Sequence, residues 1–211
     1  MIGCTRLTGS QLQGVAVLIA ILLLQACATG PAPVPANLVL DQREQQLMAL
    51  NNWQFSGKLG VKAPADSASL YINWQQQQQK FSIDLQGPLG QGSAKMAGDK
   101  RRATLEHDGQ SYSASNAEAL VLERFGWQLP VEQLRYWVRA LPTPEAIGER
   151  EINRDAQGLL LSQSQQGWQM HYSQYQWVGE QALPGKIRAE SEALGVRLIL
   201  VINKWQLSPE E

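Results

Sequence analysis

The feature that most constrains the fold is a period-two alternation of apolar and polar residues that begins at Trp53. Three successive segments carry it, at 53–61, 68–74 and 81–86. Successive side chains of a β-strand point to opposite faces of the sheet, so each segment predicts a strand with one apolar face. The glutamine tract 75–79 lies between two of these segments and is expected to be a solvated hairpin tip. This part of the chain is therefore predicted to be antiparallel sheet.

The later sequence adds shorter strands and a few helices. Further strands are expected at 93–97, 102–106, 111–114, 159–163, 168–177, 185–190 and 196–205. Apolar residues spaced three and four apart predict helices at 37–51, 116–125 and 131–141. The segment 144–155 has no clear apolar pattern, so its placement stays open. The element order favours a mainly β fold with α (α+β), in which a single curved antiparallel sheet has helices over its concave side.

The N-terminus has the pattern of a lipoprotein signal. An unbroken apolar run from Val15 to Leu24 is too short to span a bilayer comfortably, and Leu24-Gln25-Ala26-Cys27 resembles the bacterial lipobox. In that motif the cysteine is acylated before the signal is removed. The alternatives are an ordinary secretory cleavage site with an incidental cysteine, or an uncleaved anchor. Ala28, rather than the Asp of the inner-membrane retention pattern, implies the periplasmic face of the outer membrane.

These signals divide the chain into three parts. We expect a signal peptide at 1–26, an acylated cysteine and flexible tether at 27–36, and one domain at 37–211. Residues 27–211 carry 17 basic and 19 acidic side chains, so nothing favours binding to nucleic acid. Cys4 leaves with the signal and Cys27 is modified, so the domain has no thiol for a disulfide or a cysteine metal site.

The sequence offers no catalytic constellation. Residues 109–113 lack the second glycine of a nucleophile elbow, and the two histidines, His107 and His171, are read as a turn residue and a strand residue. Metal-binding and nucleotide-binding motifs are missing, so we predict no enzymatic activity, no metal and no cofactor. Seven tryptophans follow the lipobox. Either all of them are packed in the core, or some of them line an apolar cavity for acyl chains. Composition alone does not distinguish these two alternatives.

The order of motifs behind the lipobox resembles the LolB family of outer-membrane lipoprotein receptors. The motifs are Trp53–Gly60, Tyr71–Gln75, Gly87–Gly90, Tyr112–Ala114, Leu129–Val131, Gly167–Trp168 and Leu183–Pro184. The resemblance implies an open half-barrel with a helical lid over a hydrophobic cavity. It also implies a monomer that accepts acylated lipoproteins from the periplasmic carrier LolA. These would then be inserted into outer-membrane phospholipid without a cofactor.

Two groups of site residues follow. The resemblance assigns Leu89 to membrane insertion, with Pro88 and Gly90 holding its turn; the alternative is a leucine folded back onto its hairpin. Alternation suggests a set of side chains that face the acyl-chain cavity: Phe55, Leu70, Ile72, Phe81, Ile83, Trp137 and Leu198.

Two other functions stay open from the residues alone. One is a structural or assembly lipoprotein that holds another envelope protein. The other is a lipid-modifying hydrolase, which ranks last because no triad is found.

Overall fold

The structure is a computed structural model that describes residues 40–64, 66–90, 92–144 and 151–207. Its strands fall into two blocks, with helices before the first block and between the two. In chain order the elements are α2 (Leu40–Ala49), β1 (Asn52–Lys62), β2 (Ser67–Gln77), β3 (Lys80–Gln86), the 3-10 turn η2 (Pro88–Gly90), β4 (Ala94–Gly98), β5 (Ala103–His107), β6 (Gln110–Ala114), α3 (Ala117–Phe125), α4 (Val131–Trp137), β7 (Glu151–Arg154), β8 (Leu160–Gln165), β9 (Trp168–Ser173), β10 (Gln176–Val178), β11 (Gln181–Leu183), β12 (Lys186–Ser191) and β13 (Val196–Leu207).

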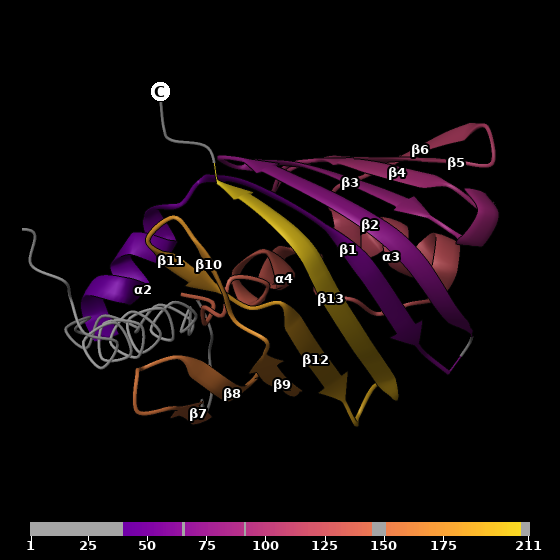
Figure 1. Ribbon diagram of the computed structural model, residues 1–211. Helices are drawn as coiled ribbons and strands as arrows, with labels where there is room; N and C mark the ends of the chain where they lie inside the picture. The colour runs from indigo at the N-terminus through magenta and orange to yellow at the C-terminus, as the bar shows by residue number, and fades with distance from the viewer. Residues whose placement is uncertain (1–39, 65, 91, 145–150, 208–211) are drawn as a thin grey trace, which may run out of the picture. The chain divides into compact units, whose positions relative to one another are not determined.

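One antiparallel sheet holds most of the strands. Its order is β6-β5-β4-β3-β2-β1-β13-β12-β9-β8-β7, and β10 pairs with β11 in a separate hairpin. The pairing of β1 with β13 joins the two blocks, and β6 and β7 are the edges of the open sheet. Figure 1 shows the sheet curving around α4, with α3 on the same side. The predicted mainly β fold, with a single curved antiparallel sheet and helices on its concave side, is confirmed.

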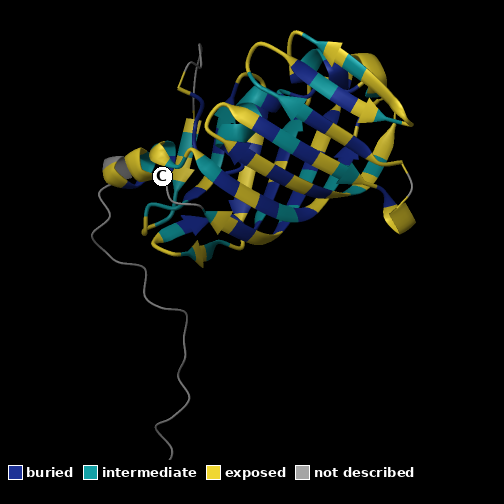
Figure 2. Cartoon of the chain, turned by 90° about the horizontal axis from the view of Figure 1, so that it is seen from above, coloured by how far each residue is buried: buried dark blue, intermediate teal, exposed yellow. Residues whose placement is uncertain are grey.

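Burial along the strands follows the alternation in the sequence. Figure 2 shows this as a checkerboard of buried and exposed residues across the sheet. Gly57 lies on β1 beside a register shift in the pairing with β13. A Cβ at Gly57 would collide with the carbonyl oxygen of Val201, so only glycine allows the two strands to approach this closely here.

The helices between the strand blocks begin and end at recognisable residues. The Asn116 side chain caps α3 by accepting a hydrogen bond from the Ala119 N–H, and Gly126 ends the helix in the left-handed conformation. α4 ends at Trp137, earlier than the predicted limit of 141. The turn that follows it is closed by a hydrogen bond from the Leu141 N–H to the Tyr136 carbonyl.

The prediction of one strand over 168–177 is wrong in its second half. β9 ends at Ser173, Gln174 turns the chain with φ +55°, and β10 leaves the main sheet to pair with β11. The apolar positions change phase at this turn, from Trp168, Met170 and Tyr172 to Tyr175 and Trp177, so the pattern did carry a sign of the break. Within the segment that was left open, residues 151–154 form the edge strand β7.

Candidate functional site

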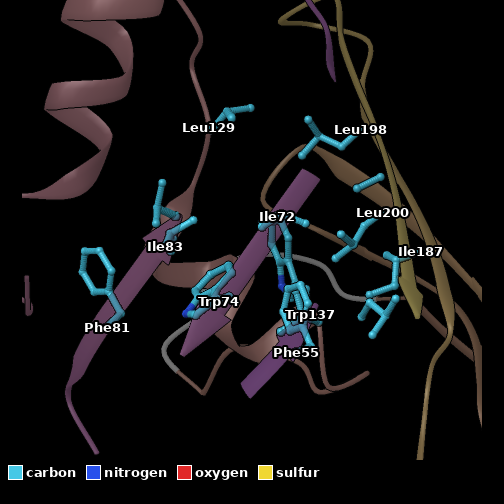
Figure 3. Close-up of a cluster of buried hydrophobic side chains, with 14 of the residues drawn as sticks. Phe55, Ile72, Trp74, Phe81, Ile83, Leu129, Trp137, Ile187, Leu198 and Leu200 are labelled. Atoms are coloured by element: carbon cyan, nitrogen blue, oxygen red, sulfur yellow. The ribbon is translucent and has the colours of Figure 1, made fainter. Parts of the chain in front are cut away.

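An apolar cavity lies between α4 and the middle of the sheet. Its volume is about 50 Å³, and its lining comes from the α4 segment and from strands β1, β2, β9, β12 and β13. Every lining side chain is apolar: Leu59, Ile72, Trp74, Leu129, Leu134, Trp137, Val138, Met170, Ile187, Ala189, Leu198 and Leu200. Figure 3 shows a group of these side chains converging from helix and sheet. A water molecule in the liquid occupies about 30 Å³, so the volume of the cavity is comparable to that of very few water molecules.

Local structure explains which side chains reach the cavity. Leu134, Trp137 and Val138 are three and four residues apart, so they share one face of α4 and the turn after it. Leu198 and Leu200 are two residues apart on β13, so they point to the same face of the sheet. The cavity is therefore where a helical stripe meets the inner faces of adjacent strands.

The same inner face is solidly packed next to the cavity. Four aromatic side chains from β1, β2 and β13, which we call the aromatic cluster, fill this part of the core: Trp53, Phe55, Trp74 and Trp205. The ring centroids of Phe55 and Trp205 lie 5.1 Å apart, and those of Trp53 and Trp74 lie 5.6 Å apart. The Trp205 indole N–H donates to the Pro184 carbonyl at 3.0 Å. Trp74 belongs to both regions, so the filled core grades directly into the cavity.

The side chains predicted to face the cavity divide into two groups. Three of them line it: Ile72, Trp137 and Leu198. The other four lie in the surrounding core or at its margin: Phe55, Leu70, Phe81 and Ile83. Sequence reasoning missed lining residues such as Met170 on β9 and Ile187 on β12. Both lie at inward positions of predicted strands, so the signal for them was present.

A buried arginine ties the C-terminal end of the α4 segment to α2. Arg139 Nη1 donates to the carbonyls of Leu47 at 2.6 Å and Leu50 at 2.9 Å, and the guanidinium lies 5.7 Å from the Trp53 ring centroid. Burial lowers the pKa of Arg139 to about 10, so the side chain stays charged at neutral pH. Carbonyls at a helix C-terminus carry partial negative charge, which stabilises this cation.

The turn between β3 and β4 holds Leu89 out in solvent. The Leu89 side chain is 97% exposed, and its φ of +60° is left-handed. The turn is closed by a hydrogen bond of 3.2 Å from the Gly90 N–H to the Gly87 carbonyl. Left-handed backbone costs a residue with a side chain about 1–2 kcal/mol, and an exposed leucine gains nothing from burial. The alternative of a leucine folded back onto its hairpin is excluded, and stability does not explain the residue.

The remaining candidates for chemistry are scattered over the sheet. His107 Nδ1 lies 3.2 Å from the Ser93 carbonyl oxygen, and His171 is exposed on β9. Within the four described ranges, no three His, Cys, Asp or Glu residues are grouped to hold a metal ion. Among those same residues no helix has the length and apolar character needed to cross a membrane. Cys27 and the predicted tether lie outside the described residues.

Comparison of the sequence with known families gives a match over most of the domain. The model of the family "Outer membrane lipoprotein LolB" matches residues 51–205. The outer-membrane lipoprotein LolB of Cellvibrio japonicus is 43% identical over 191 residues, which cover 87% of this chain and 91% of the relative. LolB of Pseudomonas aeruginosa is 40% identical over 164 residues, which cover 77% of this chain and 78% of the relative.

Solved structures show the same fold at low sequence identity. A LolA superfamily protein from Nitrosomonas europaea superposes with a TM-score of 0.56 at 10% identity, covering 85% of this chain and 96% of that one. A putative outer-membrane lipoprotein-sorting protein domain from Vibrio parahaemolyticus gives 0.51 at 6% identity, covering 82% and 92%. The matched region of the family model runs from the residue before β1 into β13, so it includes both the cavity and the Leu89 turn. The chain belongs to the LolB family of outer-membrane lipoproteins.

Proposed function

We propose that the cavity beneath α4 takes up the acyl chains of lipoproteins and that Leu89 assists their delivery into the outer membrane. The carrying observation is a wholly apolar cavity closed by one short helical segment, in a chain of this family. Family membership makes the chain an outer-membrane lipoprotein receptor and not an enzyme. The proposed donor is the periplasmic carrier LolA, and the proposed acceptor is outer-membrane phospholipid.

Uptake requires the cavity to enlarge, because about 50 Å³ does not hold an acyl chain. Moving the α4 segment would expose apolar side chains such as Leu129 and Leu134, at a cost of about 1.5–3 kcal/mol each. Burying about ten methylenes of an acyl chain contributes about 8 kcal/mol, at about 0.8 kcal/mol each. The two terms are similar in size, so cargo binding can drive opening without a nucleotide or other cofactor.

Delivery is proposed to use the Leu89 turn. A single exposed leucine on a tight turn can enter the headgroup region of a bilayer, where its side chain regains the burial it lacks in water. Pro88 and Gly90 would hold the turn in shape. Lipid attachment at Cys27, followed by the tether 27–36, would keep the domain at the periplasmic face of the membrane, where it would act as a monomer.

A binding experiment tests the cavity. The chain with Cys27→Ser, which has no acyl group of its own, is mixed with a fluorophore that brightens in apolar surroundings and is then titrated with a triacylated lipopeptide. We expect the fluorophore to bind and the lipopeptide to displace it, with Leu89→Glu as a matched control that leaves both steps unchanged. Failure of the fluorophore to bind, or of the lipopeptide to displace it, would overturn the uptake proposal and favour a scaffolding lipoprotein.

A further inference from the structure

The C-terminal end of the α4 segment is held by a buried polar clamp. Gln165 Oε1 accepts hydrogen bonds from the Trp137 indole N–H at 3.0 Å and the Thr143 N–H at 3.1 Å. Its Nε2 donates to the Thr143 carbonyl at 3.2 Å, and Gln163 Nε2 donates to the Leu141 carbonyl at 3.4 Å. Breaking buried hydrogen bonds leaves polar groups without partners, which is costly. This end of the segment therefore resists displacement from the sheet.

A change of backbone direction lies at the same end. Ala140 has a left-handed φ of +57°, and the N–H groups of Ala140 and Leu141 donate to the carbonyls of Trp137 and Tyr136. This is a Schellman motif, which ends the helical turn sharply. Arg139 within it is fixed to α2 by the bonds described above. Residues 138–141 thus form the corner between α4 and the clamped segment that follows.

The N-terminal end of α4 has far weaker attachments. Pro130 precedes the helix and supplies no side-chain cap. Instead, Glu118 Oε1 of α3 accepts a hydrogen bond of 2.7 Å from the Glu132 N–H. Lys100 adds an ion pair with Glu132 at 3.7 Å, but both side chains are substantially exposed, so water screens it. The Glu118 bond is therefore the main polar contact that holds this end down.

Two buried polar atoms at this end have no partner among the described residues. They are the Trp127 indole nitrogen, Nε1, and the Gln133 side-chain oxygen, Oε1. Movement of this end into water would hydrate both atoms, which offsets part of the cost of exposing the apolar Leu129. The clamped end also has two such atoms, Thr143 Oγ1 and Gln163 Oε1, so the difference between the two ends lies in the hydrogen bonds of the clamp. In Figure 3, Leu129 lies at the top of the view and Trp137 lower down beside Phe55, and both line the cavity.

We infer that α4 rotates about residues 138–141, so that its N-terminal end moves away from the cavity. The hydrogen bond from the Glu132 N–H to Glu118 holds this end in the closed position. Glu118 is a positioning residue, because it acts through the Glu132 backbone. α3, which carries Glu118, stays packed on β5 and β6, where the Arg124 guanidinium lies 3.7 Å from the Tyr112 ring centroid. The purpose of this motion rests on the proposed function, but the motion belongs to the ligand-free chain.

Thiol labelling at two matched positions tests the rotation of α4. Leu129 and Thr143 are 8% and 6% exposed, so Leu129→Cys and Thr143→Cys report the two ends from equal burial. Both are made in the full chain with Cys4→Ser and Cys27→Ser, and the rate of reaction with a water-soluble thiol reagent is measured without lipid or cargo. Urea unfolding checks that each variant folds. Val131→Cys, at 6% exposure, replaces Leu129→Cys if that variant does not fold.

We expect Leu129→Cys to react at least tenfold faster than Thr143→Cys. Glu118→Ala should raise the rate at Leu129→Cys at least threefold and leave Thr143→Cys unchanged, whereas Glu118→Gln retains an oxygen acceptor and should restore the slow rate. Gln165→Ala, which removes the hydrogen bonds to the Thr143 backbone, should raise the labelling rate at Thr143→Cys. Equal labelling rates at both ends, or faster reaction at Thr143→Cys, would contradict the rotation of α4 about residues 138–141. An equal effect of Glu118→Ala on the labelling rates at both ends would contradict the role of the Glu118 hydrogen bond in holding the N-terminal end. Because no cargo is present, failure here is distinct from failure of the uptake proposal.

Discussion

The cavity and the Leu89 turn are both apolar, yet the first hides its side chains beneath α4 and the second holds one side chain out in water. The cavity leaves space unfilled in the core beside the tightly packed aromatic cluster. The turn leaves a leucine 97% exposed in a left-handed conformation. Each feature forgoes stability that a fully packed fold would have, in opposite ways. The difference suggests two separate steps, one that receives acyl chains and one that meets the membrane.

The largest effect on stability is expected on the cavity side. Trp137→Ala removes a side chain that is 1% exposed, together with its hydrogen bond to Gln165. The free energy of unfolding, measured by urea denaturation, should fall by about 3–5 kcal/mol. Leu89→Ala serves as the control and should change it by less than about 0.5 kcal/mol. A loss below about 1 kcal/mol for Trp137→Ala would mean that α4 contributes little to the core.

Alkaline pH should also separate the two regions. Burial raises the pKa of Tyr172 and of Tyr175 above the usual value, so the folded chain keeps these protons when the unfolded chain loses them. Stability should therefore fall above pH 10 by about 1.4 kcal/mol per pH unit for each tyrosine. Burial lowers the pKa of Arg139 and of Arg43, and these two groups act in the opposite direction and reduce the fall in stability.

Urea unfolding between pH 9 and pH 11 measures this net slope. Tyr175→Phe removes one tyrosine contribution and should shift the slope upward by about 1.4 kcal/mol per pH unit. Substitutions at Leu89 should leave the slope unchanged, because residues 87–90 carry no titratable side chain. The same slope in Tyr175→Phe and in the unsubstituted chain would contradict the burial of the Tyr175 phenol.

A smaller gain is expected at the turn. Leu89→Gly relieves the left-handed backbone, worth about 1–2 kcal/mol, but glycine also increases the entropy of the unfolded chain. The net gain in unfolding free energy should be up to about 1 kcal/mol, accompanied by weaker delivery to vesicles. Leu89→Asn, which also tolerates this conformation, is the matched polar variant. Undiminished delivery by both variants would separate Leu89 from membrane contact.

Filling the cavity should change stability little. Ala189 is 2% exposed and lines the cavity, so Ala189→Leu adds apolar atoms where space exists. Unfolding free energy should change by less than about 1 kcal/mol, whereas fluorophore binding should weaken several-fold. At Gly57 the added atom would meet backbone, so Gly57→Ala should cost more than Ala189→Leu although it adds less. A larger loss of stability for Ala189→Leu than for Gly57→Ala would mean that there is no free space beside Ala189.

Alternation predicted the sheet because it records which face of a strand is buried. It does not record where along that face a residue lies, so Phe55 and Ile72 have the same pattern, although one packs in the aromatic cluster and the other lines the cavity. The turn at Gln174 was missed because a left-handed glutamine has no signature of its own, although the apolar positions change phase between Tyr172 and Tyr175. The tight turn around Leu89 was readable from glycine and proline, but the full exposure of its leucine depends on the folded hairpin.

Two-step transfer of a labelled lipoprotein tests the central claim most directly. The cargo is presented in its LolA complex to the chain with Cys27→Ser, and liposomes are added after uptake has been measured. We predict that Ala189→Leu slows uptake, whereas Leu89→Glu accepts cargo like the unsubstituted chain but fails to deliver it. Failure of both variants at the same step, or no uptake by the unsubstituted chain, would contradict the division of roles between cavity and turn.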